Sequence, residues 1–106
     1  MPKYLIEASF TTEGVKGIQS AGGTARVDAV TKSVESVGGK LESFYFAFGD
    51  DDVFTVLDFP DNVSAAAVSM TVGASGLVRT RTTVLLSPEE VDEAAGKSVS
   101  YRGPGE

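Results

Sequence analysis

Two runs rich in aromatic and β-branched residues occupy the middle of the chain, at 41–48 and 53–60. The short polar break Gly49–Asp52 between them predicts a β-hairpin. A loop centred between Asp50 and Asp51 would pair Phe48 with Val53, Phe46 with Thr55, and Phe44 with Leu57. The residues expected on the opposite face are Tyr45, Ala47, Phe54, Val56 and Asp58. Both faces are mostly apolar, so both need cover.

The patterns on either side of the hairpin predict further strands and helices. Alternation over Lys3–Phe10 and the β-prone composition of Leu77–Leu86 indicate a first and a last strand. The Gly-broken stretch 11–23 is expected to be a loop with one turn of helix. A helix should then run from a Thr24 N-cap to about Val37, where Gly38-Gly39 ends it. Its predicted inner stripe is Val27, Val30, Val34 and Val37.

Two more helices are expected after the hairpin. Asp61 or Asn62 can cap a helix that reaches about Ser75. The predicted inner stripe of this helix is Val63, Ala66, Ala67, Met70 and Ala74. Ser87-Pro88-Glu89-Glu90 has the form of a capping box, which predicts a short helix to about Ala95, ended by Gly96.

The resulting order, β-α-β-β-α-β plus a short C-terminal helix, indicates an α+β, ferredoxin-like fold. Such a fold has a four-stranded antiparallel sheet, with the first strand between the third and fourth and both long helices on one face. We expect a single domain over 1–96 and a tail over 97–106. The helix-free face would expose residues such as Tyr45 and Phe54, which predicts a homodimer packed sheet against sheet, or a higher homo-oligomer.

The composition limits the classes of partner and of site chemistry that the chain can have. Nine basic and fifteen acidic residues give a net charge of −6, which argues against nucleic acid or an anionic membrane as partner. No signal peptide and no bilayer-spanning apolar stretch is evident, so a cytoplasmic location is expected. The absence of Cys and His rules out thiolate nucleophiles, Ser-His-Asp triads and sites that depend on Cys or His ligands. We expect no cofactor and no metal.

The candidate site residues are Glu7, Asp58, Arg79, Arg81 and Tyr45. In the predicted strand order Glu7 lies beside Arg79 and Arg81, and a mid-strand charge is costly unless it is paired. One interpretation is a cross-strand ion pair at the rim of a dimer interface. The other is a polar pocket in which a carboxylate acts as base and Arg binds an anionic or enolic substrate.

The tyrosines and the acidic turn are two further candidate groups. Tyr45, like Tyr4 and Tyr101, could supply a phenol to a ligand pocket. Asp50-Asp51-Asp52 lacks the ligand spacing of a calcium loop, so a solvated turn is the preferred interpretation.

Several segments resemble the GYD domain family. They are Lys3-Tyr4-Leu5-Ile6, Ser9-Phe10-Thr11, Glu13-Gly14-Val15-Lys16-Gly17, Gly38-Gly39-Lys40-Leu41, Tyr45-Phe46-Ala47-Phe48-Gly49, Thr82-Thr83-Val84-Leu85-Leu86 and Pro88-Glu89-Glu90. In the Gly-x-Tyr-Asp turn that names the family, Gly49 and Asp52 match, but Asp51 stands where Tyr is usual. The resemblance implies a ferredoxin-like, dimeric α+β barrel type of domain and supplies no catalytic residues.

The preferred functional hypothesis is therefore a small homo-oligomeric domain of unknown molecular function whose ligand, if it has one, is a small organic molecule. The first alternative is a cofactor-independent oxygenase-like or isomerase-like enzyme with a cleft between helices and sheet. The second is a protein–protein assembly module, in which the tail and the hairpin edge make contacts beyond the dimer.

Overall fold

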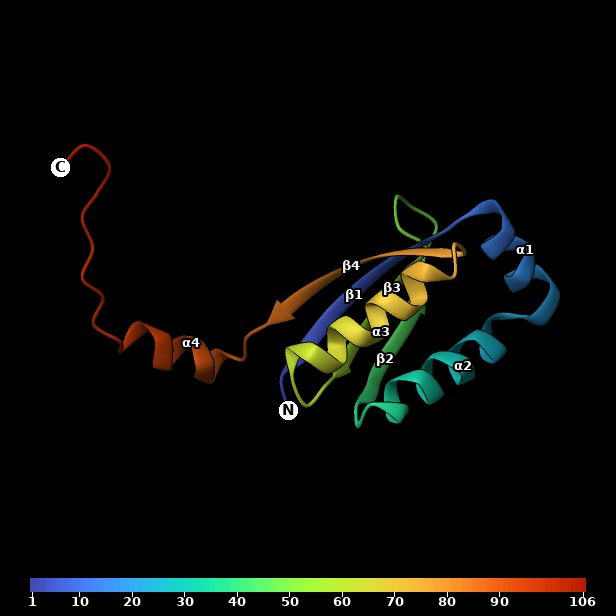
Figure 1. Cartoon of the computed structure of the whole chain (residues 1–106), viewed down its shortest axis with the longest axis horizontal. Coiled ribbons are helices and arrows are strands. Elements are labelled where there is room, and N and C mark those ends of the chain that lie inside the picture. Colours follow the sequence, from blue (N-terminus) through green and yellow to red (C-terminus); the bar gives the residue numbers. More distant parts are fainter.

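The computed structural model describes residues 1–106 and contains one antiparallel sheet of four strands, in the order β2-β3-β1-β4 (Figure 1). The strands are β1 (Lys3–Phe10), β2 (Lys40–Phe46), β3 (Val53–Asp58) and β4 (Val78–Leu85). The helices are α1 (Thr12–Ala21), α2 (Gly23–Ser36), α3 (Asn62–Ala74) and α4 (Pro88–Ala95). The element order and the place of β1 between β3 and β4 confirm the predicted ferredoxin-like α+β fold.

The core lies between the sheet and the two long helices. Alternate residues of β1, including Tyr4 and Ile6, point toward the helices and are buried. Val34 of α2 and Val68 of α3 pack with them in one cluster, so both helices cover the same face. The Tyr4 ring meets Phe59 edge to face with centroids 5.4 Å apart. This arrangement anchors the start of β1 beneath α3 and leaves the other side of the sheet without helices, which we call the open face.

The predicted register of the β2–β3 hairpin was wrong. The structure pairs Phe46 with Val53 and Tyr45 with Phe54, two residues away from the predicted alignment. The loop is longer because it folds back onto β1: the Asp52 backbone N–H donates to the Ala8 carbonyl oxygen at 2.8 Å. A shift of two positions leaves the side chains within the two strands on their predicted faces. Tyr45 therefore still lies on the open face, where it is exposed. Phe48, predicted to face inward opposite Val53, instead lies in the loop beyond β2 and is fully exposed.

The predicted loop over 11–23 was wrong, because α1 fills most of it. Thr11 caps this helix by accepting a hydrogen bond from the Gly14 backbone N–H. Gly22, at φ 89°, separates α1 from α2 and is the N-cap of α2, so the predicted Thr24 cap was also wrong. The conformation of Gly22 is one that residues with a side chain rarely adopt, which explains why two helices form here instead of one.

The inner side of α3 was also assigned wrongly. Ala65, Val68 and Val72 pack on the core, whereas the predicted stripe is exposed: Val63, Ala66, Ala67, Met70 and Ala74. Because α3 is apolar on all sides, its periodicity does not distinguish an inner face from an outer one. The Val30–Val34–Val37 part of the α2 stripe does pack on the core as predicted.

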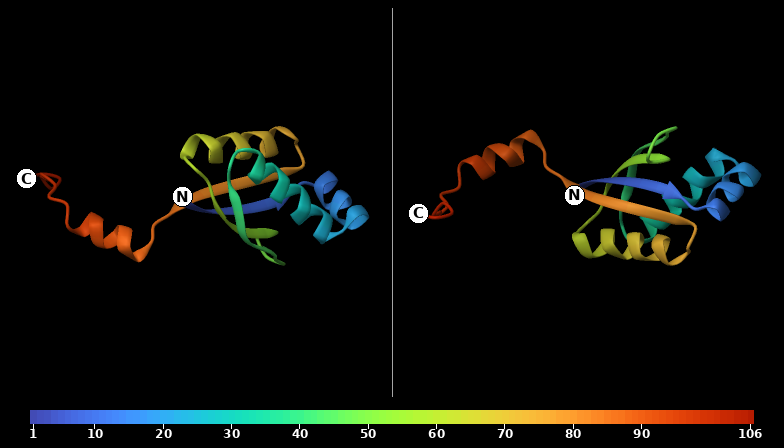
Figure 2. Two further views of the ribbon diagram at one scale, coloured as in Figure 1. Left: turned by 90° about the horizontal axis from the view of Figure 1, so that it is seen from below. Right: turned by 90° about the horizontal axis from the view of Figure 1, so that it is seen from above.

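The end of the chain leaves the body of the molecule. Residues Leu86–Glu106, which we call the C-terminal arm, extend away from the sheet in every view (Figures 1 and 2). The capping box of α4 is present as predicted, with Ser87 and Glu90 each accepting a hydrogen bond from the backbone of the other, and Gly96 follows the helix. None of the helices is long and apolar enough to cross a membrane.

Candidate functional site

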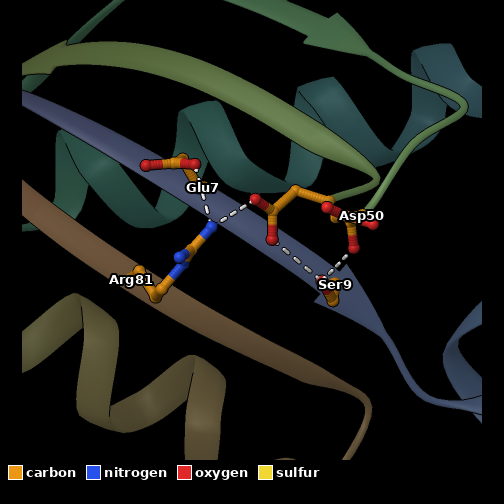
Figure 3. A network of polar contacts seen from close by, with 5 residues as sticks. Glu7, Ser9, Asp50 and Arg81 are labelled. Atoms are coloured by element: carbon orange, nitrogen blue, oxygen red, sulfur yellow. Dashed lines mark hydrogen bonds and ion pairs between the residues drawn. The ribbon is translucent and has the colours of Figure 1, made fainter.

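The open face carries an ion cluster built from two strands and the hairpin loop (Figure 3). Arg81 of β4 stands opposite Glu7 of β1, and its Nη2 donates to Glu7 Oε2 at 3.0 Å. The same nitrogen also donates to the Asp51 carboxylate from the loop. Ser9 Oγ completes the cluster by donating to Asp51 Oδ1 at 3.1 Å. The predicted cross-strand pair between Glu7 and an arginine is thus present, with Arg81 as the partner.

Electrostatics favour the ionised form of this cluster. Burial by itself raises the pKa of Asp51, but the hydrogen bonds from Arg81 and Ser9 outweigh it, so the pKa is lowered. The hydrogen bond to Asp51, and then its charge, raise the pKa of Arg81. A guanidinium already held by two carboxylates is poorly placed to bind an anionic substrate, so the cluster fits a structural role that ties the loop to the sheet.

The remaining candidates lie in two places. Arg79 lines a hollow of about 310 Å³ on the open face together with the cluster residues, and no carboxylate pairs with it. Asp58 lies opposite Lys3 of β1, about 13 Å from Glu7 along the sheet at roughly 3.3 Å per residue. Its carboxylate accepts a hydrogen bond from Lys3 Nζ at 3.0 Å. Tyr45 is 70% exposed near the β2 edge and lines none of the hollows described here. The structure therefore brings Glu7, Arg79 and Arg81 together, but not Asp58 or Tyr45.

The acidic turn does not form a converging set of oxygens. Asp51 is directed to Arg81 and Ser9. The Asp52 carboxylate accepts from the Phe10 backbone N–H at 2.8 Å. These contacts fasten the loop over the end of β1, and no group of three or more carboxylates suited to a metal ion forms in the structure.

A second hollow system lies on the helical side of the sheet. Its outer part, about 230 Å³, lies between α1, α2 and the first residues of β4. Its inner part, about 50 Å³, lies between α2, α3 and the sheet. Phe10 and Arg26 line both parts, so the two adjoin at these residues. We call the combined space the helix–sheet recess.

Arg26 is the notable group of this recess. It lies in the first turn of α2 and is only partly exposed, and this burial lowers the pKa of its guanidinium. No carboxylate lies within ion-pair distance of it, although five such pairs form elsewhere in the chain. The only other charged residue in the lining, Glu13, pairs with Lys16 at 3.5 Å. Arg26 thus presents an unmatched positive charge to a largely apolar space.

The sequence held a signal for Arg26 that the prediction did not use. Residues 26, 30 and 34 are spaced four apart, so Arg26 continues the buried Val30–Val34 stripe toward the helix N-terminus. A charged residue at an inward position of an amphipathic helix is unusual and marks a candidate site. Ser9 could likewise have been grouped with Glu7, because positions i and i+2 of a strand lie on the same face.

Comparisons with known proteins identify the family. The model of the GYD domain matches residues 4–95, which is most of the chain and includes both the ion cluster and the helix–sheet recess. No curated protein and no solved structure matches the chain. The match supports the resemblance seen in the sequence and brings no catalytic residues with it.

Proposed function

The chain belongs to the GYD domain family, and on that premise we propose that it is a homo-oligomeric binding domain whose helix–sheet recess takes a small organic anion. The observation that carries the proposal is the unpaired Arg26 at the junction of two mainly apolar hollows.

The recess has the character of a ligand site. Ligand pockets are concave and mostly apolar, with a few polar groups that orient the ligand. Here the inner part is walled mainly by hydrophobic residues, and Thr80 contributes a hydroxyl. The hydroxyls of Thr55 and Ser69 also line it, but they are hydrogen-bonded to the Ser43 carbonyl and the Thr82 hydroxyl, respectively. The outer part has room for about eight waters at roughly 30 Å³ each. That space suits a molecule of about ten non-hydrogen atoms, smaller than a nucleotide or a typical drug.

The charge of Arg26 defines the ligand class. A partly buried cation without a partner loses hydration and gains no compensating contact. A carboxylate or phosphate monoester placed at the guanidinium would accept two parallel hydrogen bonds and restore that loss. The uncharged body of the ligand would then lie against the apolar lining. Glu13, the only carboxylate in the lining, is 72% exposed and contacts Lys16 at the surface. No acid or base group is buried within the recess apart from Arg26, which favours binding over catalysis.

The homo-oligomer is supported by the open face. Phe54 is 39% exposed there and Tyr45 70%, on opposite strands of the hairpin. Two such faces stacked about 10 Å apart would bury these rings and leave the recess of each copy on the outside of the dimer. We place this assembly in the cytoplasm, in keeping with a helix set that includes no membrane span.

Calorimetric titration with matched probes tests the ligand proposal. Phenylacetate and phenyl phosphate represent the two anion types, and phenylacetamide and phenol are their uncharged counterparts. We expect an anion to bind with a dissociation constant on the order of a millimolar or below, as befits a ligand of this size. Arg26→Met should weaken that binding at least tenfold. Lys32→Met, an exposed change on the same helix, should not.

The outcome is decisive in either direction. Preference for phenylacetate indicates a carboxylate ligand, and preference for phenyl phosphate a phosphate ester. The proposal fails if both anions bind no better than their uncharged counterparts, or if Arg26→Met binds as well as the parent protein. Native mass spectrometry of protein purified from its own source would show any retained ligand directly.

A further inference from the structure

The C-terminal arm contains a well-specified helix that packs on nothing. All eight residues of α4 are exposed, although its capping box is complete and Pro88 occupies the first turn. Helices shorter than about 12 residues are marginal in water without tertiary packing. A cap contributes only about 1 kcal/mol. The helix therefore needs a partner surface that this copy of the chain does not provide.

One side of α4 is suited to packing. Val91, Ala94 and Ala95 fall at i, i+3 and i+4 and form an apolar stripe. The four acidic residues of the helix lie on its remaining sides: Glu89, Glu90, Asp92 and Glu93. A helix of this kind packs its stripe on another apolar surface and keeps its carboxylates in water.

The exposed surface of the chain is large enough to supply a dimer interface. The chain exposes 7282 Å², whereas a compact monomer of this mass exposes about 5,600 Å². The excess, about 1,700 Å², is roughly twice what one partner contributes to a standard protein interface. The radius of gyration is likewise 17.0 Å, against about 13 Å for a compact chain of this length. A second copy can bury such an excess reciprocally.

Each copy also offers a surface of matching character. The 13 residues of α3 include no charged side chain. On its outer side Val63 is 78% and Met70 74% exposed, with Ala66 and Ala67 between them. Small alanines on both helices allow close approach. A helix that is apolar all round is normally buried on all sides, so the outer side of α3 lacks a cover.

We propose that the C-terminal arm is exchanged between two copies of this chain, with the Val91 stripe of α4 from one copy packed on the outer side of α3 of the other. The exchange is reciprocal, so it closes with two-fold symmetry. It uses neither the open face of the sheet nor the recess, so it goes beyond the proposed function and stands without it.

The geometry favours exchange over folding back. Only Leu86 and Ser87 connect β4 to α4, and Ser87 is extended at φ −72° and ψ 159°. The arm leaves the sheet at the end where α3 begins and runs onward from the body (Figures 1 and 2). With so short a connection, α4 lies off the α3 of its own copy and projects outward, where a second copy can reach it.

The absence of native cysteine makes a direct test available. Two full-length variants, Val91→Cys and Met70→Cys, are mixed and oxidised, so that a mixed disulfide can form only between chains. We expect this mixed species to be the main product. Glu93→Cys, placed on the opposite side of α4, is the matched control and should give little mixed disulfide with Met70→Cys. The proposal is overturned if Val91→Cys forms no mixed species, or if Glu93→Cys pairs equally well.

Sedimentation velocity gives a second, independent readout. Val91→Asp should weaken association at least tenfold, while Glu93→Gln leaves it unchanged. Because α4 lies off the body, the melting temperature of Val91→Asp at low concentration should match that of the parent protein. Association unaffected by Val91→Asp would contradict arm exchange. Phe54→Asp, on the open face, tests the sheet-to-sheet contact separately, so failure of one interface is distinguishable from failure of the other.

Discussion

The packing of α1 against the start of β4 can be tested with two glycines of the same helix. A Cβ built on Gly14 would lie 2.2 Å from the carbonyl oxygen of Leu77 and 3.3 Å from Phe10 Cβ. That oxygen is held in place, since it accepts from the Thr11 backbone N–H at 3.0 Å. A Cβ on Gly17 meets nothing within 4 Å. The two positions therefore share a helical setting and differ in available space.

The expected changes in the free energy of unfolding follow from opposing effects. Replacing glycine by alanine inside a helix stabilises it by about 1 kcal/mol. Gly17→Ala should show most of this gain. Gly14→Ala gains the same amount, but overpacking costs about 1–3 kcal/mol, and moving Leu77 weakens a hydrogen bond that contributes about 1 kcal/mol. We expect Gly14→Ala to be less stable than the parent protein by about 1–3 kcal/mol.

Urea unfolding and thermal melting measure the difference. A change of 1 kcal/mol shifts the melting temperature of a domain of this size by about 4–8 °C. Gly17→Ala should thus melt several degrees above the parent protein and Gly14→Ala several degrees below it. If Gly14→Ala melts at or above the parent temperature, the close contact between α1 and β4 is not a feature of the protein in solution.

Three further predictions concern single contacts. The hydrogen bond from the Ser64 backbone lowers the pKa of Asp61 below 3.8. The stabilisation of the folded protein by ionised Asp61 is therefore present above that pH and is lost as the pH falls through the lowered value. Asp61→Asn should keep the helix cap, but its free energy of unfolding should fall less steeply with acid below about pH 4 than that of the parent protein. Glu7→Gln and Arg81→Met should each speed hydrogen exchange in the loop 47–52, and exchange as slow as in the parent protein would argue against the cluster's structural role. Tyr4→Phe removes a hydrogen bond of 2.5 Å to Asn62 and should lower stability by about 1 kcal/mol in urea unfolding; an unchanged midpoint would show that this bond contributes nothing.

The fold was predictable because several local signals agreed. The alternation in β1, the valine stripe of α2, the Gly38 terminator and the capping box at Ser87 each specify one element. Where a segment carried no such signal, prediction failed. Glycines in α1 suggested a loop, yet Gly14 is required because β4 approaches the helix too closely for a side chain. The uncharged α3 gave no means of choosing its inner side.

The candidate site was predictable only in part. Glu7 and Arg81 could be paired because the strand order places them side by side. Asp51 joins them from a loop, and its position depends on how the loop folds back onto β1, which no local pattern specifies. Arg26 was missed although its spacing from Val30 and Val34 gave it an inward position on α2, because the sequence does not show that its charge lacks a partner. Only the structure, which shows all neighbouring carboxylates, could reveal that absence.

The two-residue difference in hairpin alignment has a consequence for how this domain can vary. Lengthening or shortening the β2–β3 connection by an even number of residues keeps the same side chains inside, because strand periodicity is two. An odd change would turn one strand inside out unless a bulge absorbs the extra residue, as the irregularity between Leu41 and Ser43 already does in β2. The acidic turn can therefore be resized in steps of two while the aromatic core beneath it stays in place.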